Sequence, residues 1–175
     1  RYSVSCRIGV HCFPSEATLR MLISEEEANR NLCDILDESF RKTHPELLCH
    51  FTEYLPERVP VMLARASHIL NIRSMTLSDV CEATQAASYE FYQIMIESMR
   101  GHYPICGGIM PWVFKRAWPT VAIQLMDGFG EALAPYYAVG AAYHNIAVSL
   151  KLNELIYAPN EKIDLVSVFF NSTDR

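Results

Sequence analysis

The stretch GGIMPWVF, residues 107–114, carries the strongest indication of the fold. It opens with two small residues and is apolar throughout, which is typical of a short buried β-strand. A basic pair, Lys115-Arg116, and a Trp118-Pro119 step follow it. A loop through Asp127-Gly128-Phe129-Gly130 then leads to Pro135, which suits the first turn of a helix. The segment therefore predicts a strand, a long loop and a helix.

Two upstream segments complete the pattern. The clearest helix is predicted from Leu77 to Arg100, with a capping box at residues 76–79 and Gly101 at its end. Its apolar stripe indicates core packing. Residues 2–12 alternate loosely and predict a strand that ends near Gly9. The order strand, helices, strand, helix favours a parallel α/β array.

The remaining elements are predicted from local signals. Ser15 caps a short helix over residues 16–22, and the box at residues 24–27 opens a helix through Phe40 that stops before Pro45. Further short helices are predicted around residues 47–51 and after Pro60. A helix is predicted from Tyr136 to Leu150, and a hairpin follows, with strands at 155–157 and 163–170 around a turn at 159–162.

Two strands cannot close a barrel, so both ends are expected to be cut from something larger. We expect two units, residues 1–150 as an α/β segment and residues 151–175 as the start of a β domain.

Composition excludes several classes of function. The 175 residues carry a net charge of −5, which argues against a nucleic-acid or anionic-membrane surface. No apolar run is long enough to span a bilayer. The six cysteines lack CxxC spacing, so free thiols are favoured over disulfides. A metal site built from Cys6, His11 and Cys12 has no further ligands to complete it, and no metal or other cofactor is expected.

Residues 107–119, followed by residues 126–130 and 135–138, resemble the last barrel strand and last barrel helix of glycoside hydrolase family 2, the group of β-galactosidases, β-glucuronidases and β-mannosidases. Residues 8–15 are similar to the segment that begins at strand seven, and residues 44–46 to an insertion of the β-mannosidase-like members. The resemblance implies an α/β fold: strands 7 and 8 and their helices from a TIM (β/α)8 barrel, helix-rich, followed by the opening hairpin of a β-sandwich.

The resemblance also implies the chemistry of a retaining glycosidase, which needs two carboxyl groups about 5 Å apart. The family places its nucleophilic glutamate two residues before a glycine that matches Gly9, and that position is Arg7 here. An arginine is permanently cationic and cannot attack an anomeric carbon. A shift of one residue offers only Cys6 or Ile8, and the next carboxylate is Glu16. The acid/base glutamate belongs to a strand that this chain lacks, so the chain alone is predicted to be inactive.

Four residues are predicted to bind substrate: Trp112 as an apolar floor for the sugar ring, Lys115 and Arg116 on the following loop, and His11 at the rim. Each has a structural alternative, as a core tryptophan, solvated charges and a satisfied histidine. The expected partners are a carbohydrate substrate, which is a β-linked mannoside, galactoside or glucuronide, and the remainder of the barrel in a longer chain. Two other hypotheses stay open. One is a catalytically silent sugar-binding or structural remnant, and the other is an unrelated helical interaction protein.

Overall fold

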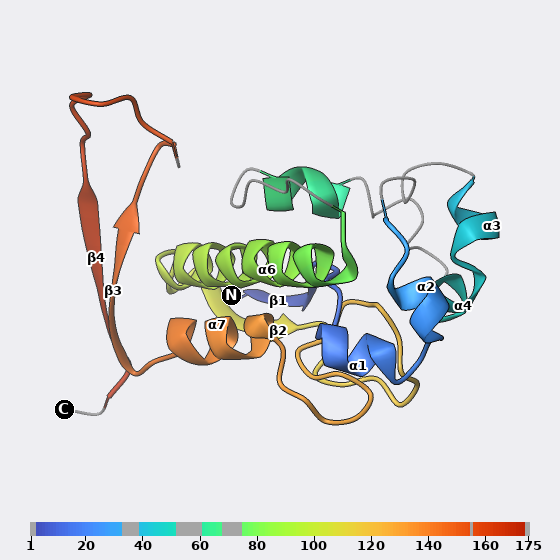
Figure 1. The fold of residues 1–175 in the computed structure, drawn as a ribbon. Coiled ribbons are helices and arrows are strands. Elements are labelled where there is room, and N and C mark those ends of the chain that lie inside the picture. Colours follow the sequence, from blue (N-terminus) through green and yellow to red (C-terminus); the bar gives the residue numbers. More distant parts are fainter. Residues whose placement is uncertain (1–2, 33–38, 52–60, 68–74, 155, 174–175) are drawn as a thin grey trace.

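The computed structural model describes residues 3–32, 39–51, 61–67, 75–154 and 156–173, and shows a mixed α/β fold (Figure 1). A helical stretch at residues 61–67 precedes the longest helix. The named elements are β1 (Ser3–Ile8), α1 (Glu16–Arg20), α2 (Glu25–Ala28), α3 (Phe40–Thr43), α4 (Pro45–Cys49), α6 (Leu77–Arg100), β2 (Cys106–Pro111), α7 (Ala134–Ala142), β3 (Ile146–Lys151) and β4 (Val166–Asn171).

The two predicted strands are confirmed as a parallel pair. β1 and β2 lie side by side with Val4 opposite Gly108, and the Trp112 N–H donates to the Ile8 carbonyl at 2.8 Å. Parallel strands need a long crossover connection, which here includes helices α1–α4 and α6. β2 is half-exposed rather than buried as predicted, with Met110 55% exposed. Within the described residues β2 pairs only with β1, so one of its edges has no neighbouring strand.

Helix α6 begins and ends where the sequence predicts. The Thr76 hydroxyl accepts from the Asp79 N–H at 3.2 Å, and the Asp79 carboxylate accepts from the Thr76 N–H at 3.3 Å, which satisfies two otherwise unpaired donors. Its first half joins a core with α1–α4 that includes Leu77 and Val80. Its second half contributes Tyr92 and Ile96 to a core shared with α7. Helices α6 and α7 therefore cover the strand pair as neighbours (Figure 1).

The helix predicted to start after Ser24 is wrong in its length. α2 ends at Ala28, residues 29–32 are not helical, and residues 33–38 lie outside the described residues. The reason is the buried Glu27 side chain, which does not cap its own helix. Its carboxylate accepts from the Glu46 N–H at 3.1 Å and the Leu47 N–H at 2.6 Å. These donors open α4, whose N-cap residue, His44, makes no side-chain capping hydrogen bond.

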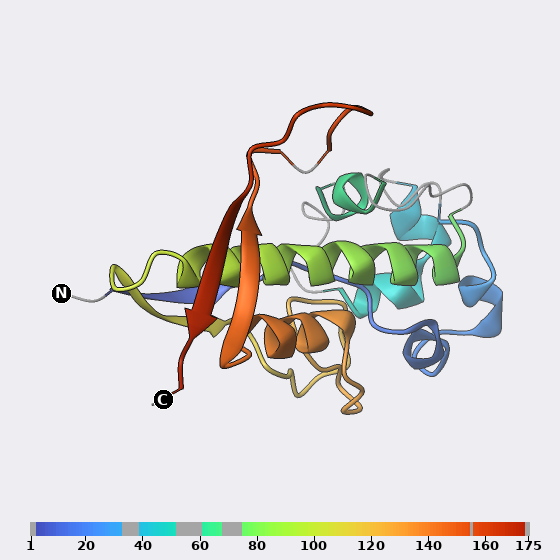
Figure 2. The same ribbon diagram turned by 90° about the vertical axis from the view of Figure 1, so that its left-hand side faces the viewer.

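The helix predicted from Tyr136 to Leu150 is also wrong in its second half. α7 ends at Ala142, and residues 146–151 form β3, which pairs antiparallel with β4. The first strand of the hairpin is therefore residues 146–151 and not 155–157. Arg100 fixes the hairpin to α6: its guanidinium lies 4.4 Å from the Phe170 ring centroid and donates to the Ala142 carbonyl. Figure 2 shows the hairpin crossing the carboxyl-terminal part of α6. The division into two units at residue 150 stays a prediction.

None of the helices in the described ranges is both long enough and apolar enough to cross a membrane.

Candidate functional site

The parallel pairing of β1 and β2 brings Arg7 and Trp112 to the same edge of the sheet. Arg7 precedes the last residue of β1, and Trp112 directly follows β2. The Arg7 guanidinium carbon lies 5.3 Å from the centroid of the Trp112 ring, a cation–π distance. Trp112 is 41% exposed, so its ring is not a core side chain. The structure thus places the two residues together; their roles stay predictions.

The backbone around Arg7 departs from regular strand geometry. Arg7 has a φ of 61°, and the strand register shifts between Cys6 and Ile8. Such a bulge re-aims a side chain at the end of a strand. Gly9 lets the chain continue past β2, because an added Cβ there would lie 2.5 Å from the Trp112 carbonyl oxygen and 2.7 Å from the Tyr92 hydroxyl. Glycine at this position is therefore needed to hold the end of β1 against Trp112.

The other predicted binding residues lie on nearby segments. Lys115 forms a backbone bridge with Met126, and its ammonium lies 3.8 Å from the Cβ position of Gly130. Arg116 is half-buried, and within the described residues its buried Nε has no hydrogen-bond partner. His11 is half-buried and directly precedes the buried Cys12. Their part in binding is an expectation that the geometry neither confirms nor contradicts.

The loop after β2 is organised by Asp127, a function that the sequence did not indicate. Asp127 is 1% exposed. One carboxylate oxygen accepts from the Phe129 N–H at 2.9 Å and the Glu131 N–H at 2.8 Å, while the other lies 2.6 Å from the Thr18 hydroxyl. A buried carboxylate with this many donors is a structural group. An aspartate followed by turn residues is the only local signal that could have predicted it.

Among the residues that the structure describes, no ion pair joins a carboxylate to Arg7. Glu16, the next acidic residue after β1, bonds to Arg20 at 2.8 Å, and this hydrogen bond lowers the pKa of Glu16. Within the described ranges, no group of three His, Cys, Asp or Glu side chains is placed to hold a metal ion. Cys12, Cys49, Cys81 and Cys106 are free thiols, and burial raises the pKa of Cys12 to about 12.

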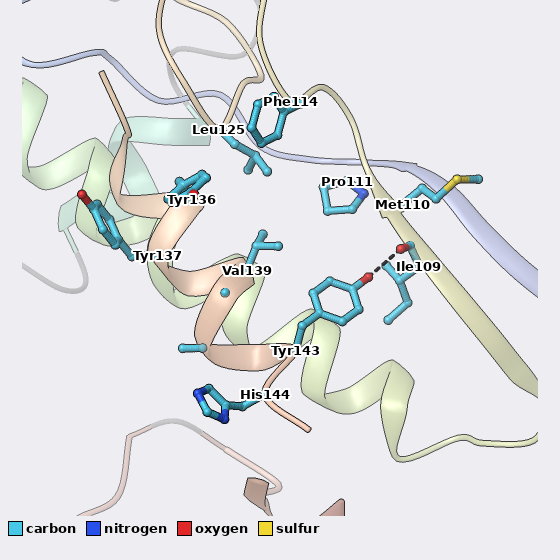
Figure 3. Close-up of a pocket in the computed structure, with 12 residues that line it drawn as sticks. Ile109, Met110, Pro111, Phe114, Leu125, Tyr136, Tyr137, Val139, Tyr143 and His144 are labelled. Carbon is cyan, nitrogen blue, oxygen red and sulfur yellow. Dashed lines mark hydrogen bonds between the residues drawn. The ribbon is translucent and has the colours of Figure 1, made fainter. Parts of the chain in front are cut away.

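A hollow of about 840 Å³ lies between β2 and α7 (Figure 3). Its walls are mainly apolar and aromatic, with Tyr143 donating from α7 to the Ile109 carbonyl at 2.5 Å. Phe114 lies at one end, where its ring meets Tyr136 edge-to-face. The hollow lies against residues 109–111 of β2, and its polar lining groups include the Tyr143 hydroxyl and the His144 imidazole.

Comparisons with known proteins give a likeness of fold. No family model matches the chain, and no curated protein matches it. Among solved structures, a β-D-mannosidase from Dictyoglomus thermophilum superposes with a TM-score of 0.73 at 19% sequence identity, over 97% of this chain and 18% of that chain. The chain thus spans less than a fifth of the length of that enzyme. At this identity the likeness establishes a shared fold, and that fold is consistent with part of a TIM barrel.

Proposed function

We propose that this chain is a carbohydrate-binding segment of a glycoside hydrolase-type (β/α)8 barrel, with the Arg7–Trp112 pair on the wall of its sugar pocket. One observation carries the proposal: an exposed indole and a guanidinium meet where two neighbouring parallel strands end. In barrels of this kind, ligands bind at the carboxyl ends of the strands. The likeness of fold to part of a β-mannosidase supports the same placement.

The pair has the chemistry that a sugar site needs. The C–H face of a pyranose can stack on the exposed Trp112 ring, because an aromatic face offers a large apolar surface. The guanidinium of Arg7, which lies over that ring, supplies hydrogen-bond donors. The substrate class proposed is a β-linked mannoside, galactoside or glucuronide.

The chain is proposed to bind such a glycoside without cleaving it. A retaining mechanism needs a nucleophilic carboxylate and an acid/base carboxyl about 5 Å away. Arg7 occupies the position where the family resemblance places the nucleophile, and Glu16 is held by Arg20. The acid/base residue would come from strands supplied by the remainder of a longer chain. The mechanism of the whole protein therefore depends on residues outside this segment.

Binding can be measured with the two tryptophans of the chain. Trp118 makes a matched control, because it is 66% exposed and stacks on His50 rather than on Arg7. Trp118→Phe leaves Trp112 as the single indole, and Trp112→Phe leaves Trp118. Titration with methyl β-mannoside, methyl β-galactoside and methyl β-glucuronide should change the fluorescence of the Trp118→Phe variant only. A folded Trp118→Phe chain with no response to any of the three glycosides would contradict the proposal.

Hydrolysis is tested with chromogenic β-mannoside, β-galactoside and β-glucuronide, whose good leaving groups reduce the need for acid assistance. The chain and its Arg7→Ala variant should release no chromophore above the rate in buffer. Turnover confined to Arg7→Glu would support the nucleophile position at residue 7. Turnover by the unmodified chain would contradict the claim that it binds without cleaving.

A further inference from the structure

We propose that Asn171, the last residue of β4, is the acceptor of an N-linked glycan, and that the first sugar of this glycan packs on the exposed Phe169 ring. Asn171-Ser172-Thr173 is the one Asn-x-Ser/Thr sequence in the 175 residues, and its middle residue is not proline. The site lies on the hairpin, apart from the Arg7–Trp112 pair, and does not depend on the proposed function.

Asn171 lies on the outer face of the hairpin, because neighbouring residues of a strand point to opposite faces. On one side of it, Phe170 is buried, with the Arg100 guanidinium 4.4 Å from the centroid of its ring. On the other side, the Ser172 hydroxyl accepts from Arg100 at 3.4 Å and the Ser172 N–H donates to the Asn145 carbonyl at 2.8 Å. Asn171 itself is exposed. The hairpin lies at one end of the molecule (Figure 1) and in front of α6 in the turned view (Figure 2), so a bulky group on its outer face extends away from α6.

The two faces of β4 differ in polarity. The inner face is apolar throughout, whereas the outer face is mainly polar; the inner residues are Val166, Val168 and Phe170, and the outer residues are Ser167, Phe169 and Asn171. Such an alternation is typical of a strand with one solvated face. Phe169 is the exception on the outer face, with 77% of its side chain exposed, and it lies two residues before Asn171. A large exposed aromatic ring beside the acceptor is a surface that the apolar face of a sugar can cover.

The end of β4 also holds the two recognition groups of the sequence together. The Asn171 carboxamide oxygen accepts from the Thr173 N–H at 3.0 Å and from the Thr173 hydroxyl at 2.6 Å. This Asx-type turn presents the carboxamide and the hydroxyl on the same side of the chain. Both bonds use the carboxamide oxygen, whereas a glycan is joined to the carboxamide nitrogen.

The donor for this reaction is an oligosaccharide joined through a diphosphate to a lipid, and a separate glycosyltransferase catalyses the transfer. The Asn171 carboxamide nitrogen forms a C–N bond to the anomeric carbon of the first sugar, an N-acetylhexosamine. The C–O bond from that carbon to the diphosphate breaks, and the lipid diphosphate leaves with the bonding electrons. The nitrogen loses one proton to a base of the transferase, so no oxidant or reductant is needed.

The acceptor is tested by expressing the chain behind a secretion signal in cells that attach high-mannose glycans. The secreted chain should carry one glycan, and its removal by peptide N-glycosidase F should leave aspartate at position 171, which peptide mass spectrometry identifies. Thr173→Ala should abolish the modification. Asn153→Gln is the matched control, because Asn153 is exposed but has no Ser or Thr two residues later. An unmodified Asn171 in a secreted chain that circular dichroism shows to be folded would overturn the proposal, as would a glycan at Asn171 that survives Thr173→Ala.

Thermal unfolding of the same glycoprotein tests the packing on Phe169. Endoglycosidase H trims the glycan to its first sugar and should leave the unfolding midpoint unchanged. A sample from which peptide N-glycosidase F has removed the whole glycan should unfold about 2 °C lower. This difference should vanish in Phe169→Ala and persist in Phe129→Ala, a change at another exposed phenylalanine. Equal midpoints of the trimmed and fully deglycosylated chains would overturn the packing of the sugar on Phe169, as would a difference that persists in Phe169→Ala.

Discussion

Arg7, at the end of β1, and Asp127, in the loop after β2, have opposite surroundings in the fold. Asp127 is buried, and its carboxylate receives two backbone N–H groups and lies beside the Thr18 hydroxyl. Arg7 is exposed and contacts an aromatic face. The carboxylate of Asp127 has its hydrogen-bonding capacity used within the protein. The guanidinium N–H donors of Arg7 remain available to a ligand.

The difference in burial and partners assigns Asp127 to the stability of the fold and Arg7 to ligand recognition. A buried carboxylate persists only where donors compensate its lost hydration, so its removal should unfold the protein more easily. An exposed guanidinium on a ring contributes little to folding, so its removal should alter binding alone. Each variant below tests one side of this contrast.

The largest effect is expected from Asp127→Ala. Its two backbone donors and the Thr18 hydroxyl would lose their acceptor, and the free energy of unfolding should fall by about 3 kcal/mol. Urea denaturation followed by circular dichroism measures the change. Asp164→Ala, at an exposed aspartate in the hairpin loop, is the control and should have almost no effect. Equal stability of the two variants would remove the structural role assigned to Asp127.

A smaller loss in the free energy of unfolding is expected from Gly9→Ala, which should affect both stability and binding. The added methyl would lie 2.2 Å from an Ile123 side-chain carbon and 2.5 Å from the Trp112 carbonyl oxygen, so the chain must shift at a cost of about 2 kcal/mol. Gly140→Ala is the matched control, because no atom lies within 4 Å of the corresponding position. Glycoside binding should weaken in Gly9→Ala even under conditions where the variant remains folded. Unchanged glycoside binding by a Gly9→Ala variant with reduced stability would mean that the binding site does not involve Trp112.

The smallest effect is expected from Arg7→Gln, compared with Arg100→Gln. Both arginines lie over aromatic rings, but Arg100 also donates to the Ala142 carbonyl at the end of α7. Arg100→Gln should lower the free energy of unfolding by about 1 kcal/mol, while Arg7→Gln should change it by no more than about 0.5 kcal/mol. Thermal unfolding of the two variants side by side measures the difference. A larger loss for Arg7→Gln would mean that Arg7 is a folding residue rather than a binding residue.

Local signals predicted the elements whose stability is local. The capping box at Thr76 and the glycine at 101 fixed both ends of α6, and Ser15 fixed the start of α1. Arg7 and Trp112 lie close together because the two predicted strands are parallel neighbours that end at one edge.

The failures have a common physical cause in distant contacts. Glu27 was expected to support its own helix, but its carboxylate binds N–H groups 19 and 20 residues away. Residues 146–150 were expected to continue a helix, but pairing of residues 146–151 with residues 166–171 makes them a strand. In both places an acceptor or partner elsewhere in the chain outweighs local propensity.

The sequence by itself therefore determined the order of helices and strands and the parallel pairing of the first two strands. It also placed a cationic residue, Arg7, at the end of the first strand. Only the tertiary structure decided which polar side chains form their hydrogen bonds within the protein. The Thr18–Asp127 bond joins residues 109 positions apart, and the hollow between β2 and α7 arises from packing that no local pattern encodes. Whether a polar group stabilises the fold or remains available to a ligand depends on its burial and partners, and these exist only once distant segments have met.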